Sequence, residues 1–163
     1  MNIKIVGHKQ ALKLLEESPN QLYVIFISSP HERRKYAVEG SERIAGLAKE
    51  CCELFFDDVT WPIHNEVVAQ ESDVKKALDF AKEKSDVIVT CQAGVSRSSA
   101  VAYCIATALN GPLLALSVLN QRIHSPNELV VKHGSIILEN PEMLDIIQRW
   151  KSETISFELQ GWN

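Results

Sequence analysis

Short runs of β-branched and aromatic residues alternate, in the first half of the chain, with segments whose apolar positions have helical spacing. Strands are predicted at Ile3–Val6, Leu22–Ser28, Glu53–Asp57 and Val87–Thr90. Helices are predicted between them at His8–Glu17, Ser41–Lys49 and Asp73–Lys84. Nearly continuous apolar strands that alternate with helices indicate an α/β fold, in which helices flank a small central parallel sheet of about four strands.

After the fourth strand the pattern is helical throughout. Helices are predicted at Arg97–Leu109, Pro112–Arg122, Pro126–Leu138 and Pro141–Lys151. The run Ser125-Pro126-Asn127-Glu128 offers a capping hydroxyl, a proline for the first helical position and a glutamate that closes a capping box. The tail from Ser156 to Asn163 has no clear pattern.

Length and charge narrow the possible classes of protein. The 163 residues are 45% hydrophobic and contain no repeat or flexible linker, which predicts one domain over residues 1–163. A net charge of -4 supplies no positive field, so neither nucleic acid nor a membrane is an expected partner. The most hydrophobic region, Ser98–Leu119, is interrupted by Asn110-Gly111-Pro112 before it could span a bilayer. Because Met1–Gly7 also lacks a signal-peptide pattern, a cytoplasmic location is expected.

Cysteine usage indicates a reduced protein with one candidate reactive thiol. The adjacent pair Cys51-Cys52 argues against a disulfide scaffold, and neither could pair with an oxidised Cys91 unless it lay close to it. No Cys or His spacing is typical of a metal site, so no metal or other cofactor is expected. Cys104 lies in an apolar helical stretch and is predicted to pack in the core. Only Cys91 has surroundings typical of a reactive thiol.

Cys91 ends a predicted buried strand, and a loop around Gly94 leads to Arg97-Ser98 at the start of an apolar helix. Ligands of open α/β sheets bind at this end of the strands. A loop that leads into a helix N-terminus presents several amide N–H groups together, which suits a phosphate dianion. Arg97 can hold two phosphoryl oxygens, and the positive surroundings favour the Cys91 thiolate. Ser98 can donate a hydrogen bond to that sulfur.

A cysteine followed six positions later by arginine is a weak signal by itself, but the added glycine, the serine and the flanking elements make it specific. The run Cys91-Gln92-Ala93-Gly94-Val95-Ser96-Arg97-Ser98 resembles the signature loop of cysteine-based protein tyrosine phosphatases, and is closest to the dual-specificity branch. The resemblance implies a phosphotyrosine protein phosphatase-like fold and metal-free hydrolysis through a phosphocysteine intermediate. It assigns catalysis to Cys91, Arg97 and Ser98, and substrate binding to Gln92, Ala93, Gly94, Val95 and Ser96.

Such a mechanism also needs a proton donor for the departing oxygen. In the dual-specificity branch this is an aspartate about thirty residues before the cysteine, in a loop after the preceding strand. Asp58 lies 33 positions before Cys91, and Asp57 lies 34 positions before it. Asp58 is the predicted donor because Asp57 would still continue the strand, although either aspartate could instead cap a turn.

One residue departs from the family pattern. Thr90 stands where the family usually has a histidine, and a threonine forms hydrogen bonds but carries no charge. A less readily ionised Cys91 and slower turnover are therefore expected, with phosphate binding retained. The predicted enzyme hydrolyses phosphate monoesters, foremost phosphotyrosine in proteins, with phosphoserine and phosphothreonine as further substrates. The alternatives are a weakly active or inactive module that binds phosphorylated partners, and a sulfur-transfer site.

Substrate class depends on the charges around the loop. Residues 92–96 contain no lysine, whereas relatives that act on phosphoinositides tend to add positive charge there. A singly phosphorylated protein side chain is therefore the favoured substrate. The cluster His31-Glu32-Arg33-Arg34-Lys35 follows the second strand and either guides an acidic substrate or forms a solvated loop. The physiological substrate and the oligomeric state do not follow from the sequence.

Overall fold

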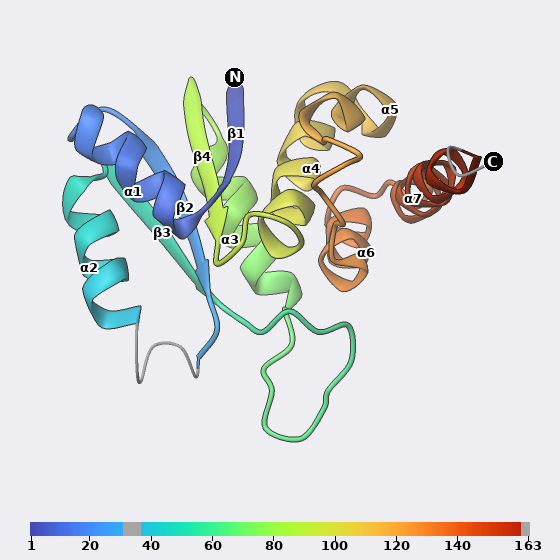
Figure 1. Ribbon diagram of the computed structural model, residues 1–163, viewed down its shortest axis with the longest axis horizontal. Helices are drawn as coiled ribbons and strands as arrows, with labels where there is room; N and C mark the ends of the chain where they lie inside the picture. The colour runs from blue at the N-terminus through green and yellow to red at the C-terminus, as the bar shows by residue number, and fades with distance from the viewer. Residues whose placement is uncertain (31–36, 161–163) are drawn as a thin grey trace.

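The computed structural model describes residues 1–30 and 37–160 of the chain. Its four strands are β1 (Asn2–Gly7), β2 (Tyr23–Ser28), β3 (Glu50–Phe55) and β4 (Asp86–Cys91). They form one parallel sheet in the order β1-β4-β2-β3, which confirms the predicted α/β fold (Figure 1). All four carboxyl ends lie at the lower edge of the sheet in Figure 1, so the loops that follow the strands meet there.

Helices cover both faces of the sheet. The described helices are α1 (His8–Glu17), α2 (Ala37–Leu47), α3 (Glu71–Ala81), α4 (Arg97–Asn110), α5 (Pro112–Ala115), the 3₁₀ turn η2 (Leu116–Val118), α6 (Glu128–Ile137) and α7 (Glu142–Gln160). Figure 1 shows α1 and α2 on one face, and α3 and α4 on the other. Val24 and Phe26 belong to the apolar cluster of the first face, whereas Ile25 and Ile27 belong to that of the second. Burial of both faces explains why the strands are almost continuously apolar.

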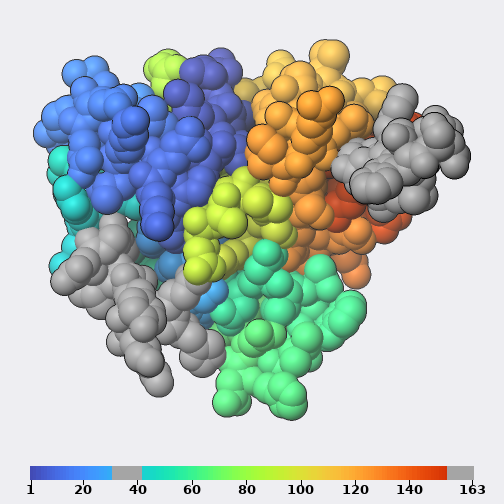
Figure 2. Space-filling model, viewed as in Figure 1, coloured from blue at the N-terminus to red at the C-terminus, as the bar shows by residue number. Residues whose placement is uncertain are grey.

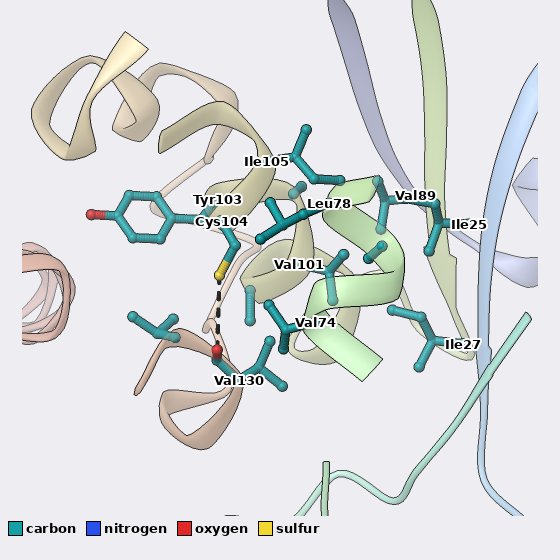
Figure 3. Close-up of a cluster of buried hydrophobic side chains, with 14 of the residues drawn as sticks. Ile25, Ile27, Val74, Leu78, Val89, Val101, Tyr103, Cys104, Ile105 and Val130 are labelled. Carbon is teal, nitrogen blue, oxygen red and sulfur yellow. Dashed lines mark hydrogen bonds between the residues drawn. The ribbon is translucent and has the colours of Figure 1, made fainter. Parts of the chain in front are cut away.

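Helix α4 is the central helix of the second face and is buried from Arg97 to Thr107. Cys104 is completely buried on it, and its thiol donates to the carbonyl oxygen of Val130 at 3.8 Å (Figure 3). A Cβ atom on Gly134 would stand 2.4 Å from the Cys104 sulfur, so α6 packs closely against α4. The core position predicted for Cys104 is confirmed.

The third strand begins and ends earlier than predicted. β3 covers Glu50–Phe55 instead of Glu53–Asp57, because its register pairs Glu50 with Tyr23 and Phe55 with Ser28. An edge strand tolerates charged residues such as Glu50, which weakened the apolar signal at its start. Asp57 therefore lies outside the strand, and the reason given for preferring Asp58 as proton donor was wrong.

Three helix boundaries in the first half of the chain and at the tail also differ. Helix α3 begins at Glu71 because Gln70 and Asp73 form a capping box, and it ends at Ala81, shortly before Glu83 with its φ of 64°. Helix α2 covers Ala37–Leu47, earlier than the predicted Ser41–Lys49. Helix α7 continues to Gln160, into the tail where no pattern was visible.

The segment predicted as one helix from Pro112 to Arg122 is helical only in its first part, as α5 and η2. Asn120 follows, and its side-chain oxygen accepts from the backbone N–H of Arg122 at 3.0 Å. A local side-chain bond of this kind competes with helical hydrogen bonding and ends the helix. The cap of α6 was also wrong, since Asn127 and not Ser125 accepts the first N–H groups of that helix.

Two further expectations concerned the charged cluster after the second strand and the absence of a membrane-spanning helix. The charged cluster at residues 31–35 lies outside the described residues. Among the described residues, no helix has the length and apolarity that crossing a bilayer requires.

Candidate active site

The predicted loop connects the end of the central strand β4 at Cys91 to the start of α4 at Arg97. Figure 2 shows the yellow-green surface of this loop next to the green surface of the loop that follows β3. Gly94, at the middle of the loop, has a φ of 75°, a backbone conformation that residues other than glycine rarely adopt. The loop therefore turns at the position where the sequence predicted a turn.

Cys91 and Ser98 are brought together by this turn. Both are buried, and Sγ of Cys91 lies 3.1 Å from Oγ of Ser98, within hydrogen-bond distance. Ser98 sits in the first turn of α4, so the thiol lies beside a helix N-terminus, where the helix dipole favours negative charge.

The other three cysteines are unsuited to nucleophilic chemistry. Burial raises the pKa of Cys51 to about 12 and that of Cys104 to about 12, and burial also raises the pKa of Cys52. At neutral pH these thiols are protonated, and a thiol is a far weaker nucleophile than a thiolate.

The sheet register also answers whether the Cys51-Cys52 pair can reach Cys91. Cys52 pairs with Ile25, which pairs with Val89, so Cys52 stands two strands and two residues from Cys91. That separation is on the order of 12 Å, whereas a disulfide needs Cα atoms within about 7 Å. Cys51 is one residue further along the strand, away from Cys91. A disulfide between Cys91 and either residue is therefore incompatible with this fold.

Arg97 is buried, with only 5% of its surface exposed. Its Nη1 donates to Oγ of Ser29 at 3.0 Å and to the carbonyl oxygen of Phe56 at 3.1 Å. These partners follow β2 and β3, so the guanidinium spans the carboxyl ends of two strands. Its Nε is buried and has no hydrogen-bond partner in the part of the chain that the structure describes. An unpaired buried donor is costly, and an oxyanion is the acceptor that suits it.

The two candidate aspartates have different surroundings. Asp57 is buried; its Oδ2 accepts from the N–H of Val67 at 2.7 Å, and its own N–H donates to the Val67 carbonyl oxygen at 2.7 Å. Asp57 thus closes the base of the loop after β3. Asp58 is exposed, and its Oδ1 accepts from Oγ of Ser96 at 2.7 Å. Of the two carboxylates, Asp58 is the one that contacts the Cys91–Arg97 loop.

Comparison with known proteins gave matches among solved structures alone. No protein-family model matches the chain, and no curated protein matches it. A crystal structure of PTPMT1 in complex with PI(5)P matches with 17% sequence identity over 96% of this chain and 94% of that chain, at a TM-score of 0.53. A second PTPMT1 structure matches with 17% identity over 98% and 95% of the two chains, at 0.50. The fold is that of the cysteine-based protein tyrosine phosphatases. Tk-PTP in its active form also matches, with 13% identity over 93% and 92% of the chains, at a TM-score of 0.46.

Within this phosphatase fold, the residue before the cysteine points away from the loop. Thr90 pairs in register with Val6 and Phe26, and both of these belong to the apolar cluster under α1 and α2. Its side chain is fully buried, and its hydroxyl has no hydrogen-bond partner among the described residues. Thr90 therefore contributes neither a charge nor a hydrogen bond to the loop.

Neighbouring segments hold the carbonyl groups of the loop from outside. The Gln92 carbonyl oxygen accepts from the N–H of His8 at 3.4 Å, and that of Val95 accepts from the N–H of Ser125 at 3.0 Å. Because C=O and the next N–H of a planar trans peptide point in opposite directions, the amides that follow these carbonyls point away from the supporting segments. The N–H groups concerned are those of Ala93, which points away from His8, and of Ser96, which points away from Ser125.

Several residues that build the site carried little or no sequence signal. Ser29 follows β2 in a short polar stretch, and only its position after a strand could have indicated it. Gly7 ends β1, and a Cβ there would stand 3.0 Å from the Gln92 carbonyl oxygen. Asn127 was part of a predicted helix cap, but no pattern connected it with Asp58, to which it donates at 2.9 Å.

Replacing Gly94 with alanine should disrupt the loop. The positive φ costs an alanine about 1–2 kcal/mol, and the new Cβ would stand 2.5 Å from the backbone nitrogen of Gly7 and from the backbone carbon of Val6. Backbone atoms cannot move aside easily, so the loop must shift. We expect kcat/KM for an aryl phosphate to fall at least about 100-fold, because misplacement by about 1 Å has effects of this size.

Gly111→Ala is the matched control. Gly111 also has a positive φ, 81°, but a Cβ there meets no atom within 4 Å. The control should lose thermal stability, because its positive φ also strains an alanine, and it should keep its activity. Equal activity losses in the two variants would contradict a specific role for the contact between Gly94 and β1.

Proposed function

We propose that the protein hydrolyses phosphate monoesters, foremost phosphotyrosine in proteins, through a phosphocysteine intermediate. The observation that carries the proposal is the hydrogen bond between Ser96 and Asp58. It places a carboxyl group against the loop that begins with the thiol of Cys91 and ends with the buried guanidinium of Arg97. Nucleophile, oxyanion partner and proton donor are the three parts that this reaction requires.

In the proposed first step, the Cys91 thiolate attacks phosphorus, and the P–O bond to the leaving group breaks. Protonated Asp58 gives its proton to the departing oxygen, so that an alcohol or phenol leaves. Arg97 and the amides of residues 92–96 hold the other phosphoryl oxygens, where negative charge is spread in the transition state. Nε of Arg97 is the donor that we assign to one of these oxygens.

In the proposed second step, water attacks the phosphocysteine. Asp58, now a carboxylate, accepts a proton from that water, and the S–P bond breaks to release inorganic phosphate. Ser98 donates to the departing Cys91 sulfur, from which it lies 3.1 Å away. No metal or other cofactor takes part in either step.

The surroundings of Asp58 support a substrate with a bulky group beyond the phosphate. A cavity of about 470 Å³ is lined by Asp58, Trp61, Ser96, Asn127 and Lys151, among other residues. Trp61 is 65% exposed, so its indole is available to contact a peptide or an aromatic leaving group. We assign the part of the substrate next to the phosphorylated side chain to this cavity.

A substrate panel tests the proposal. We expect hydrolysis of a phosphotyrosine peptide, with lower kcat/KM for phosphoserine and phosphothreonine peptides. PI(5)P belongs in the panel because the matched PTPMT1 structure contains it. We expect it to be a poorer substrate, since Gln92, Ala93, Val95 and Ser96 offer no cationic side chain to a second phosphate. Release of inorganic phosphate measures all four.

The alternatives make different predictions for the same panel. A module that only binds phosphorylated partners would bind the peptides and release no phosphate from any of them. A sulfur-transfer enzyme would convert thiosulfate at a rate insensitive to Arg97→Ala. Either result would overturn the proposed phosphatase activity.

A further inference from the structure

Asn127, the capping residue of α6, connects that helix to the loop after β3. It is buried, with 5% of its surface exposed. Its side-chain oxygen accepts from the N–H groups of Leu129 at 3.1 Å and Val130 at 3.2 Å. Its side-chain nitrogen donates to Oδ1 of Asp58 at 2.9 Å and to the carbonyl oxygen of Val59 at 3.3 Å. One amide therefore joins the start of α6 to the aspartate.

These partners fix the orientation of the Asn127 amide. An amide oxygen only accepts hydrogen bonds, and an amide NH₂ group only donates them. Turning the amide over would set its NH₂ against two N–H groups and its oxygen against a carboxylate and a carbonyl. The residue thus has one orientation that satisfies all four contacts, and this makes it a rigid connection.

Asn127 also supports the loop that carries the nucleophile. Its backbone N–H donates to the carbonyl oxygen of Ser96 at 3.3 Å, while Oγ of Ser96 donates to Oδ1 of Asp58 at 2.7 Å. Oδ1 of Asp58 therefore accepts two hydrogen bonds, from Ser96 and from Asn127. The three residues form a closed set of contacts between the Cys91–Arg97 loop, the loop after β3 and α6.

We propose that Asn127 is a positioning residue for proton transfer by Asp58, an inference that rests on the proposed phosphatase activity. Two donors on Oδ1 stabilise its lone pairs, so a proton on the carboxyl group resides on Oδ2. Because Oδ1 is held by two hydrogen bonds, the plane of the carboxyl group is fixed, and Oδ2 is oriented for proton transfer to the departing oxygen. Asn127 also lines the cavity beside Asp58, but in the proposed role it affects proton transfer through its hydrogen bond to Asp58 and not through a contact with the substrate phosphate.

The dependence of rate on the leaving group tests this role. Phosphotyrosine leaves as a phenol with a pKa of about 10 and needs the proton, whereas dinitrophenyl phosphate leaves as a stable phenolate and does not. In Asn127→Ser, serine keeps a cap acceptor for α6 but cannot reach Asp58 as the longer amide does. We expect kcat for a phosphotyrosine peptide to fall about 10- to 100-fold, and kcat for dinitrophenyl phosphate to fall less than about threefold.

The double variant Asp58→Asn/Asn127→Ser separates positioning from structure. If Asn127 acts through Asp58, the double variant should be no slower on the phosphotyrosine peptide than Asp58→Asn alone. Losses that multiply would overturn the proposal. So would equal slowing of the two substrates by Asn127→Ser, because a general structural defect would affect both.

Asn127→Asp provides a second variant in case serine weakens folding. Aspartate keeps the shape and the cap acceptor, loses the donor, and sets a carboxylate against Asp58. The decrease in kcat of this variant should again be confined to the phosphotyrosine peptide. A thermal melting curve checks that the variant is folded. If the wild-type protein hydrolyses both substrates, and the folded variants depend on the leaving group as the wild type does, only the positioning role is overturned. If the wild-type protein itself hydrolyses neither substrate, the phosphatase proposal is overturned as well.

Discussion

Cys91→Ser should show no measurable hydrolysis of an aryl phosphate, a loss of at least about 10⁴-fold in kcat. A serine hydroxyl at this position is not ionised at neutral pH, so the variant lacks the nucleophile that the proposed mechanism requires. The variant keeps the loop amides and Arg97, which are the groups that we propose to bind phosphate. Binding of a phosphotyrosine peptide, measured by calorimetry, should therefore be retained while turnover is lost.

Cys51→Ser is the control for this variant. Cys51 is half-buried on the edge strand β3, and its thiol is protonated at neutral pH. Its replacement should leave kcat unchanged within about twofold. Residual turnover in Cys91→Ser close to that of the wild type would show that the nucleophile lies elsewhere and would contradict the phosphocysteine mechanism.

Arg97→Lys should lower kcat/KM about 10²- to 10³-fold, although it preserves the charge. Removing a single donor to a developing oxyanion has an effect of this size. Lysine also lacks the planar fork that lets one end of Arg97 contact Ser29 and Phe56 while Nε remains for the ligand. Inhibition by inorganic phosphate should weaken together with catalysis, since the same donors serve product and transition state.

Two variants serve as controls for Arg97→Lys: one tests a similar substitution at an exposed arginine, and the other removes a hydrogen-bond partner of Arg97. Arg122 is an exposed arginine, and Arg122→Lys should leave both activity and phosphate inhibition unchanged. Ser29→Ala removes one partner of Nη1 and keeps the guanidinium, so its effect should be smaller than that of Arg97→Lys. If Arg97→Lys hydrolysed aryl phosphates at the wild-type rate, the guanidinium would not be one of the groups that bind the phosphoryl oxygens.

The loop that we propose to be catalytic was visible in the sequence because its parts are contiguous. Eight residues from Cys91 to Ser98 contain the strand end, the turn at Gly94 and the helix start. Each of these features has a local signal, such as a buried apolar run or a glycine that tolerates a positive φ. The structure therefore changed little in the description of the loop itself.

The choice between Asp57 and Asp58 shows where local signals end. The sequence preferred Asp58 for a reason that the boundaries of β3 contradict. What distinguishes the two is their partners: Val67 for Asp57, and Ser96 for Asp58. These contacts depend on how the loop after β3 returns to pair with its own base and contacts the Cys91–Arg97 loop, and no spacing rule contains that information.

By itself, the sequence determined the α/β class, and it located the Cys91–Arg97 loop and the two aspartates from which the proton donor is proposed. Those follow from patterns within a few residues, where backbone geometry and burial leave periodic signals. The tertiary structure alone decided that Ser29 supports Arg97 and that Asn127 holds Asp58, across 68 and 69 positions of the chain. Such contacts depend on strand order and helix packing, which position distant residues to within a hydrogen-bond length, and no local pattern of side chains encodes that precision.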